Sequence, residues 1–224
     1  MTDLCGLLQL ADGAFPAGSF GHSFGLETAI AAGRVHDGPT LETWIASYVV
    51  DGSATLDGGA LALALRQRAP VRALDARVSA AQTNAEIRRA NRHLARATLD
   101  TYDAIGITGP DIAAYADDIA AGVSAGTHAL AAGLGFRAIG ASVPEALEAY
   151  AAMLVGGCVS VAARAVPLGQ RVAARARRQL AGSVHAFVER ALAVRDLDDL
   201  RASAIQCEID GLRHRTLSAR LFAS

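Results

Sequence analysis

Apolar residues recur every three or four positions along most of the chain, the spacing that places side chains on one face of an α-helix. The first of the two clearest runs follows Ser142 and Pro144, with Glu145 in its first turn, a combination that favours a helix N-terminus. No segment of useful length shows the two-residue period of a strand. The pattern predicts an all-α, single-domain bundle of roughly nine or ten helices over residues 1–224. The two runs are Leu147, Tyr150, Leu154, Cys158 and Val161, and Leu180, Val184, Phe187, Ala191 and Val194.

The same periodicity predicts the extent of further helices. One helix is expected to run without a break from Val71 to about Ile105, where Gly106 follows. Another is expected to open at Thr40. Residues 119–136 carry no charged side chain, but they contain four glycines and place their larger apolar residues on one face. That pattern favours a buried helix of a soluble protein over a membrane span.

Composition supports the helical prediction and narrows the chemistry. Alanine, the strongest helix former, supplies 50 of the 224 residues. The chain has no lysine, so all 21 basic residues are arginines. A Walker-A phosphate loop, a pyridoxal Schiff base and a catalytic lysine are therefore excluded. The formal net charge of −1 gives no overall field for nucleic acid or an anionic membrane, and we expect neither as a partner.

Cysteine and histidine usage bears on compartment and on metal binding. The three cysteines lie far apart in sequence, so they do not indicate a disulfide framework. The first positive charge is Arg34, so the basic start of a signal peptide is missing. We therefore expect a cytoplasmic protein. No two histidines stand three or four residues apart, so the spacing that places two imidazoles on one helix face is missing and no metal site is predicted. The histidines are His22, His36, His93, His128, His185 and His214.

The segment from Gly21 to Gly25 reads Gly-His-Ser-Phe-Gly and matches the G-x-S-x-G nucleophile elbow of α/β-hydrolases. That interpretation would make Ser23 the nucleophile of a serine esterase. It requires a strand before Ser23, and the preceding residues contain Pro and Gly instead. The alternative is a glycine-rich entry into a helix that begins near Ser19, and we favour it.

Two surface features point to protein contacts. Arg88, Arg92 and Arg96 form a stripe with a spacing of four residues, which is either a solvated face or a protein-binding face. The chain also has few charges for its size, so it is expected to expose apolar patches of the kind that mark contact surfaces. A homodimer or a stable partner is therefore expected.

Three further stretches, in the same order along the chain, resemble elements of the urease accessory protein UreF family. The first begins at Leu7 with Leu-Leu-Gln-Leu and is followed by Ala-Gly-Arg-Val at residues 32–35. The second is Val-Pro-Leu-Gly-Gln at residues 166–170, and the third is the terminus from His214 to Ser224. The motif residues are Phe15, Pro16, Gly18, Ser19, Phe20, His22, Gly25, Leu26 and Glu27 in the first stretch, and Pro167, Leu168 and Gly169 in the second.

The sequence departs from the family pattern at a few positions. Arg215 stands where the family has an acidic residue after the tail histidine, and Ser218 and Ala219 replace a Tyr-Ser pair. Gly156 and Gly157 occupy a helix position where the family often has polar residues. These differences concern individual contacts of the tail and of the helix before residue 166.

The resemblance implies an all-α, homodimeric, cytoplasmic chaperone with no enzymatic turnover and no cofactor of its own. By family, it would bridge UreD (also called UreH) and the GTPase UreG, dock on apo-urease and support GTP-dependent nickel insertion. Residues 211–224 would be a partner-docking tail for UreD, and Arg164 and Gln170 would face UreG. The tail residues expected to make contacts are Arg213, His214, Arg215, Arg220, Leu221 and Phe222.

Overall fold

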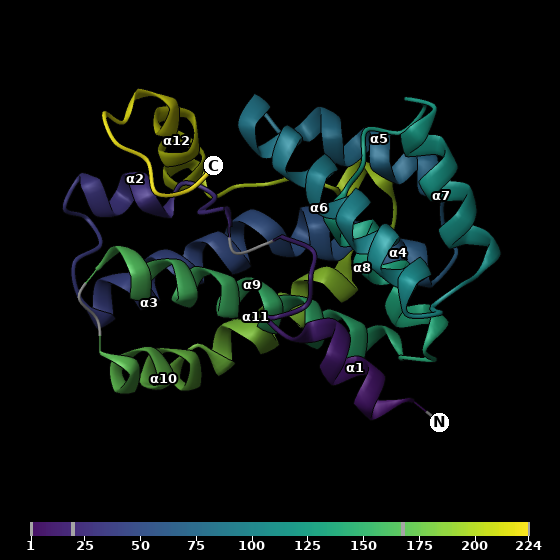
Figure 1. Cartoon of the computed structure of the whole chain (residues 1–224), viewed down its shortest axis with the longest axis horizontal. Coiled ribbons are helices and arrows are strands. Elements are labelled where there is room, and N and C mark those ends of the chain that lie inside the picture. Colours follow the sequence, from purple (N-terminus) through teal and green to yellow (C-terminus); the bar gives the residue numbers. More distant parts are fainter. Residues whose placement is uncertain (1, 19–20, 167–168, 224) are drawn as a thin grey trace.

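A computed structural model describes residues 2–18, 21–166 and 169–223, and these residues form helices, turns and loops without a strand. The all-α prediction is confirmed. Figure 1 shows the helices packed around a long central helix. The elements are α1 (Leu4–Ala11), α2 (Leu26–Ala31), α3 (Gly38–Ala46), the π-helical segment η2 (Ser47–Gly58), α4 (Gly59–Leu65), α5 (Val71–Ala81), α6 (Ala85–Ala104), α7 (Pro110–Ala120), α8 (His128–Ala138), α9 (Val143–Ala165), α10 (Gln170–Gln179), α11 (Ala181–Ala193), η3 (Leu197–Asp199), α12 (Ile205–Arg213) and η4 (His214–Thr216).

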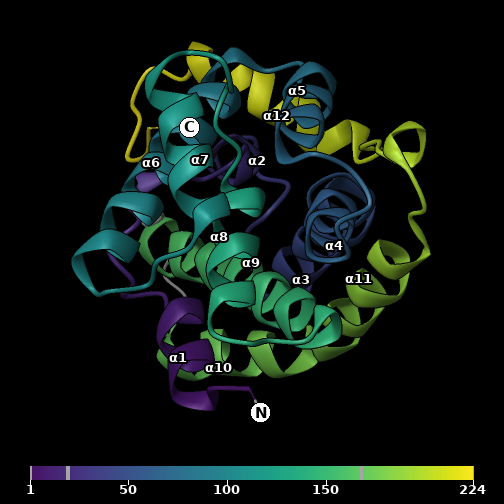
Figure 2. The same ribbon diagram turned by 90° about the vertical axis from the view of Figure 1, so that its right-hand side faces the viewer.

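The central helix is continuous through α3, η2 and α4. It begins at Gly38, two residues before the predicted Thr40, because the Asp37 carboxylate accepts the Thr40 main-chain N–H at 2.9 Å and caps the helix. Figure 2 looks nearly along this helix and shows α8, α9 and α11 around it. A Cβ atom on Gly58 would lie 2.6 Å from the Phe187 ring, so glycine permits the close approach of α11 to η2.

The predicted helix through Leu147 and Val161 is confirmed as α9. Ser142 and Glu145 form a reciprocal capping box at its start. This helix is long and apolar enough to cross a membrane by length and composition alone, but half of its most apolar window is buried inside the protein. A core helix of a globular protein has the same properties, which is the role that α9 has here. The run from Leu180 to Val194 likewise forms α11.

Two predictions of helix extent were wrong. The expected helix over residues 71–105 is divided into α5 and α6, because the Asn84 side chain accepts the main-chain N–H of Glu86 and starts a new helix. The uncharged stretch 119–136 is divided between the end of α7 and the start of α8 by a turn at residues 121–127.

A buried carboxylate fixes that turn. The Asp75 side chain of α5 accepts hydrogen bonds from the Ala125 N–H at 2.6 Å, the Thr127 hydroxyl at 2.8 Å and the Tyr115 hydroxyl at 2.6 Å. It also accepts the N–H of Gly126 at 3.1 Å. A buried carboxylate with this many donors is fully satisfied, so the chain reverses here rather than continuing as one helix.

The two ends of the chain are organised by α2 and α12. The first helix after the glycine-rich segment is α2, which begins at Leu26 and not near Ser19 as expected; Ser19 itself lies outside the described residues. Residues 211–213 complete α12, and η4 follows from His214 to Thr216. Figure 1 shows α12 and the last residues lying against α2 at one end of the molecule.

Candidate functional site

The C-terminal tail is clasped to the N-terminal motif through one buried imidazole. The Nε2 atom of His214 lies 2.9 Å from Oε2 of Glu27, and its Nδ1 atom lies 3.1 Å from Oε2 of Glu86. The His214 ring thus lies between two carboxyl groups, one at each ring nitrogen. We call this group, completed by Arg220, whose guanidinium lies 3.3 Å from Glu86, the tail clasp.

The Glu27 carboxylate also holds the backbone of the last residues. The main-chain N–H of Leu221 donates to its Oε1 at 2.6 Å, and the N–H of Phe222 donates to its Oε2 at 3.3 Å. The N–H of Ala223 donates to the carbonyl of Gly21 at 2.7 Å. One glutamate therefore fixes both the side chain that begins the tail and the backbone that ends it.

Helix α12 approaches α2 closely because Gly25 has no side chain. Gly25 has a φ of 96°, and a Cβ atom there would lie 2.7 Å from the main-chain nitrogen of Gly211. A second anchor lies on the same helix, where the buried Asp210 accepts a hydrogen bond from the Trp44 indole at 3.1 Å and pairs with Arg34. Arg34 of the Ala-Gly-Arg-Val stretch therefore contacts α12, the helix that leads into the tail.

The end of α9 also contacts the tail. The Arg164 guanidinium lies over the Phe222 ring, 4.6 Å from its centroid, a cation–π geometry. Phe222 is buried, whereas Leu221 beside it is 74 % exposed. The N-terminal motif, the end of α9 and the C-terminus, which are far apart in sequence, are therefore brought to one site.

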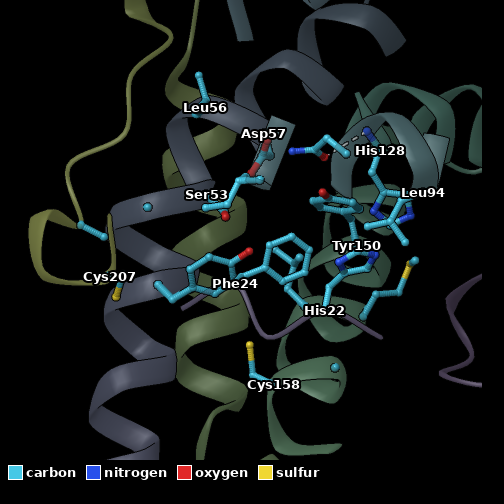
Figure 3. A pocket seen from close by; sticks show the side chains of 18 of the residues that line it. His22, Phe24, Ser53, Leu56, Asp57, Leu94, His128, Tyr150, Cys158 and Cys207 are labelled. Atoms are coloured by element: carbon cyan, nitrogen blue, oxygen red, sulfur yellow. Dashed lines mark hydrogen bonds between the residues drawn. The ribbon is translucent and has the colours of Figure 1, made fainter. Parts of the chain in front are cut away.

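A cavity of about 200 Å³ lies in the interior, lined by His22, Tyr150 and Cys207 among others (Figure 3). The π-helical segment contributes Asp57, whose carboxyl pKa burial raises to about 6, partly offset by a hydrogen bond from the Ser53 hydroxyl. Burial lowers the pKa of His128 to about 4, and its ring lies 5.8 Å from that of Tyr150. The π-helix thus places ionisable groups inside the core.

The cavity carries polar groups without a metal-ligand set. Burial raises the pKa of the Cys158 and Cys207 thiols to about 12, so both are protonated and are poor ligands at neutral pH. Within the described residues no group of three or more His, Cys, Asp or Glu side chains could hold a metal ion. Polar side chains that line a cavity of this kind are suited to binding buried water molecules.

Comparison with known proteins gives a consistent result. The sequence model of the family described as UreF matches residues 35–181. The urease accessory protein UreF of Arthrobacter sp. (strain FB24) is 33% identical over 218 residues, which covers 97% of this chain and 96% of the relative. The chain belongs to the UreF family. The proteins of the same name from Rhodopseudomonas palustris (strain HaA2) and Corynebacterium glutamicum (strain R) are 36% and 30% identical, over 94% and 97% of this chain and 89% and 96% of their own lengths.

The UreF assignment and the all-α fold remove the esterase alternative. An α/β-hydrolase elbow needs a strand before its serine, and the described residues of this UreF protein contain none. Ser23 is 1 % exposed, and its hydroxyl is buried without a hydrogen-bond partner. The relatives are named accessory proteins, which agrees with a non-catalytic role.

The predicted tail contacts divide into an inner and an outer set. His214 and Phe222 are buried within the chain, so they position the tail and do not present a surface to a partner. Arg213, Arg215 and Arg220 are exposed beside Leu221 and form an outer face. Sequence reasoning missed Glu86 and Asp210, which lie outside the motifs; Glu86 stands in the first turn of α6, a helix start that the sequence did not predict.

Most of the remaining motif residues that the structure describes have structural roles. Phe15 is buried with its ring 5.9 Å from Tyr102, and Leu26 is fully buried. The Pro16 carbonyl accepts a bond from the Thr101 hydroxyl at 3.4 Å, and Gly18 has a φ of 79°. His22 lines the cavity, and Gly169 and Gln170 are exposed at the start of α10. Ser19, Phe20, Pro167 and Leu168 lie outside the described residues.

Proposed function

We propose that this UreF family member is a non-enzymatic, cytoplasmic urease chaperone that acts as a homodimer. In this proposal it bridges UreD (UreH) and the GTPase UreG, and it supports GTP-dependent nickel insertion into apo-urease. The family assignment and the relatives' names support a role in urease maturation. Nickel is the cargo of the assembly and not a resident cofactor of this chain.

The tail clasp is the observation that carries the proposal. His214 and the main-chain N–H of Leu221 both bond to Glu27, so contacts within the chain hold the tail in place. The exposed residues of the tail, which we call its outer face, are Arg213, Arg215, Arg220 and Leu221. Arginine is enriched at protein interfaces, and the exposed Leu221 adds apolar surface to this face. We assign this outer face to UreD, and the surface around Arg164 and Gln170 to UreG.

Co-purification tests the assignment. A variant with Arg215→Glu and Leu221→Ser keeps His214, Phe222 and the clasp intact, so it is expected to fold normally. It should lose the UreD complex and urease activation when UreD, UreG and apo-urease are supplied. Arg68→Glu changes an exposed arginine on the loop after α4 and is the control. Equal complex formation by both variants would contradict the assignment of the tail to UreD.

A further inference from the structure

A groove of about 510 Å³ lies between α5, α6 and the turn at residues 121–127, and its described lining contains no residue of the tail clasp. Figure 1 shows α5, α6 and α7 together at the end of the molecule opposite α10. The groove has an apolar wall with Ala76, Ala80 and Ala125, and Val123 on the turn is 52 % exposed. Its other wall carries Arg88 and Arg92.

The two arginines are oriented toward the groove by main-chain carbonyls. The Arg92 Nε–H donates to the Ala125 carbonyl at 2.7 Å, and an Nη1–H of Arg88 donates to the Gln82 carbonyl. A guanidinium has five N–H donors, so each side chain is anchored by one and keeps several others. The pair stands one helical turn apart, and from residue 87 to residue 99 the chain has no acidic residue.

Neither arginine of this pair forms an ion pair within the described part of the chain. The ion pairs of the described residues include neither Arg88 nor Arg92. Asp75 lies at the base of the groove, but its oxygens already accept from Tyr115, Thr127 and two main-chain N–H groups. Asp118, on the neighbouring helix, is paired with Arg72 at 2.7 Å.

We propose that this groove is a docking site for a carboxylate-bearing, partly apolar segment of a protein partner. Each guanidinium can bind a carboxylate through two parallel hydrogen bonds, and the alanine wall with Val123 receives the apolar side chains between the acidic ones. A nucleic acid fits less well, because its phosphates would leave the alanine wall and Val123 without an apolar partner. The site goes beyond the proposed function, which uses the tail and the surface around Arg164 and Gln170.

Fluorescence anisotropy with the full chain tests the site. The probe is a fluorescein-labelled peptide of alternating glutamate and leucine, and its glutamine–leucine counterpart reports apolar binding alone. The acidic peptide is expected to bind saturably and to weaken as salt is added, and the neutral peptide is expected to bind about tenfold more weakly or worse. A failure of the acidic peptide to bind, or equal binding of the two peptides, would overturn the proposal.

A charge-matched pair of variants separates a site from general attraction. Arg88→Gln with Arg92→Gln should weaken the acidic peptide about tenfold. Arg89→Gln with Arg96→Gln removes the same charge from exposed positions of the same helix outside the groove, and it should change the affinity less than about twofold. An equal loss in the two variants means diffuse electrostatics only and refutes the groove.

Two further measurements cover folding and the competing ligands. Ala80→Glu leaves both arginine anchors in place and puts a carboxylate into the groove, so it should abolish peptide binding. It tests the groove without removing Arg92, whose side chain contacts the turn at residues 121–127. Inorganic phosphate and single-stranded DNA are tested as competitors. Displacement of the peptide by single-stranded DNA at lower concentration than by unlabelled acidic peptide would assign the groove to nucleic acid and overturn the proposal.

Discussion

His214 and Glu27 are 187 residues apart in sequence, yet their side chains lie 2.9 Å apart in the protein interior. His214 is fully buried and Glu27 is 6 % exposed, so little solvent screens the pair. Glu86 lies against the other ring nitrogen at 3.1 Å, and Arg220 pairs with Glu86. The contacts that join the two ends of the chain therefore depend on each of these side chains.

Removing one carboxylate of the clasp should therefore destabilise the whole chain. Glu27→Ala leaves His214 with one carboxylate and leaves the N–H groups of Leu221 and Phe222 without an acceptor. We expect the free energy of unfolding in urea to fall by about 3–5 kcal/mol, the usual cost of breaking a buried pair. Glu148→Ala removes an exposed carboxylate and should change it by less than about 0.5 kcal/mol. Similar effects of the two variants would show that the clasp contributes no stability.

The sequence predicted the members of the clasp better than their arrangement. Glu27 and His214 were both selected by resemblance, but no local pattern links residues so far apart, and their pairing depends on how α2 and α12 pack. Phe222 was expected to face a partner, because an apolar residue in a basic tail gives no sign of an intramolecular pocket. Glu86 stands in the first turn of α6, a helix start that the sequence did not predict.

Helix positions were predicted where the controlling signals are local. The α9 start follows from Ser142 and Glu145, which interact across three residues. The breaks at residues 82–84 and 121–127 were missed for different reasons. Asn84 was passed over because a single capping residue inside an apolar pattern is a weak signal, whereas the second break depends on Asp75, some 50 residues earlier in the chain. The cavity could not be predicted, since it arises from the packing of segments that lie far apart in the sequence.

The buried His128 should make the protein less stable in mild acid. Burial lowers its pKa to about 4 in the folded state from 6.5, so between these values the unfolded chain binds more protons and stability falls as the pH falls. His128→Gln should reduce the loss of unfolding free energy between pH 7 and pH 5 by about 2 kcal/mol. The raised pKa of Asp57, about 6, acts in the opposite direction and is common to both proteins.

Urea unfolding at the two pH values measures this difference. His185→Gln changes an exposed histidine and should leave the pH dependence as it is in the parent protein. A His128→Gln variant that loses as much stability as the parent between pH 7 and pH 5 would show that His128 is not the group responsible.

Two glycine-to-alanine substitutions should change the melting temperature in opposite directions. Gly25→Ala places a Cβ 2.7 Å from the nitrogen of Gly211 at a φ of 96°, so we expect a loss of about 2 kcal/mol or more and a separation of α12 from α2. Gly157 lies inside α9 with nothing near its Cβ position, so Gly157→Ala should stabilise the protein by about 0.5–1 kcal/mol. A Gly25→Ala variant as stable as the parent would contradict the close approach.

The contact between Arg164 and Phe222 allows a structural role of Arg164 to be separated from a role in partner binding. An exposed arginine would contribute less than about 0.5 kcal/mol, but stacking on the Phe222 ring should raise the cost of Arg164→Ala to about 0.5–1 kcal/mol. Phe222→Leu keeps an apolar side chain and removes the aromatic face. In that background Arg164→Ala should have almost no effect on stability, and a double-mutant cycle in urea measures the coupling.

Urease activation by the same four proteins then decides how Arg164 acts. If Arg164 contacts UreG directly, Arg164→Ala lowers UreG binding and urease activation by the same factor whether residue 222 is Phe or Leu. If it acts only by fixing the tail, Phe222→Leu alone reproduces the defect, and adding Arg164→Ala lowers activation no further. We expect the first result, because a guanidinium recognises a carboxylate or phosphate of a partner through directed hydrogen bonds as well as through its charge.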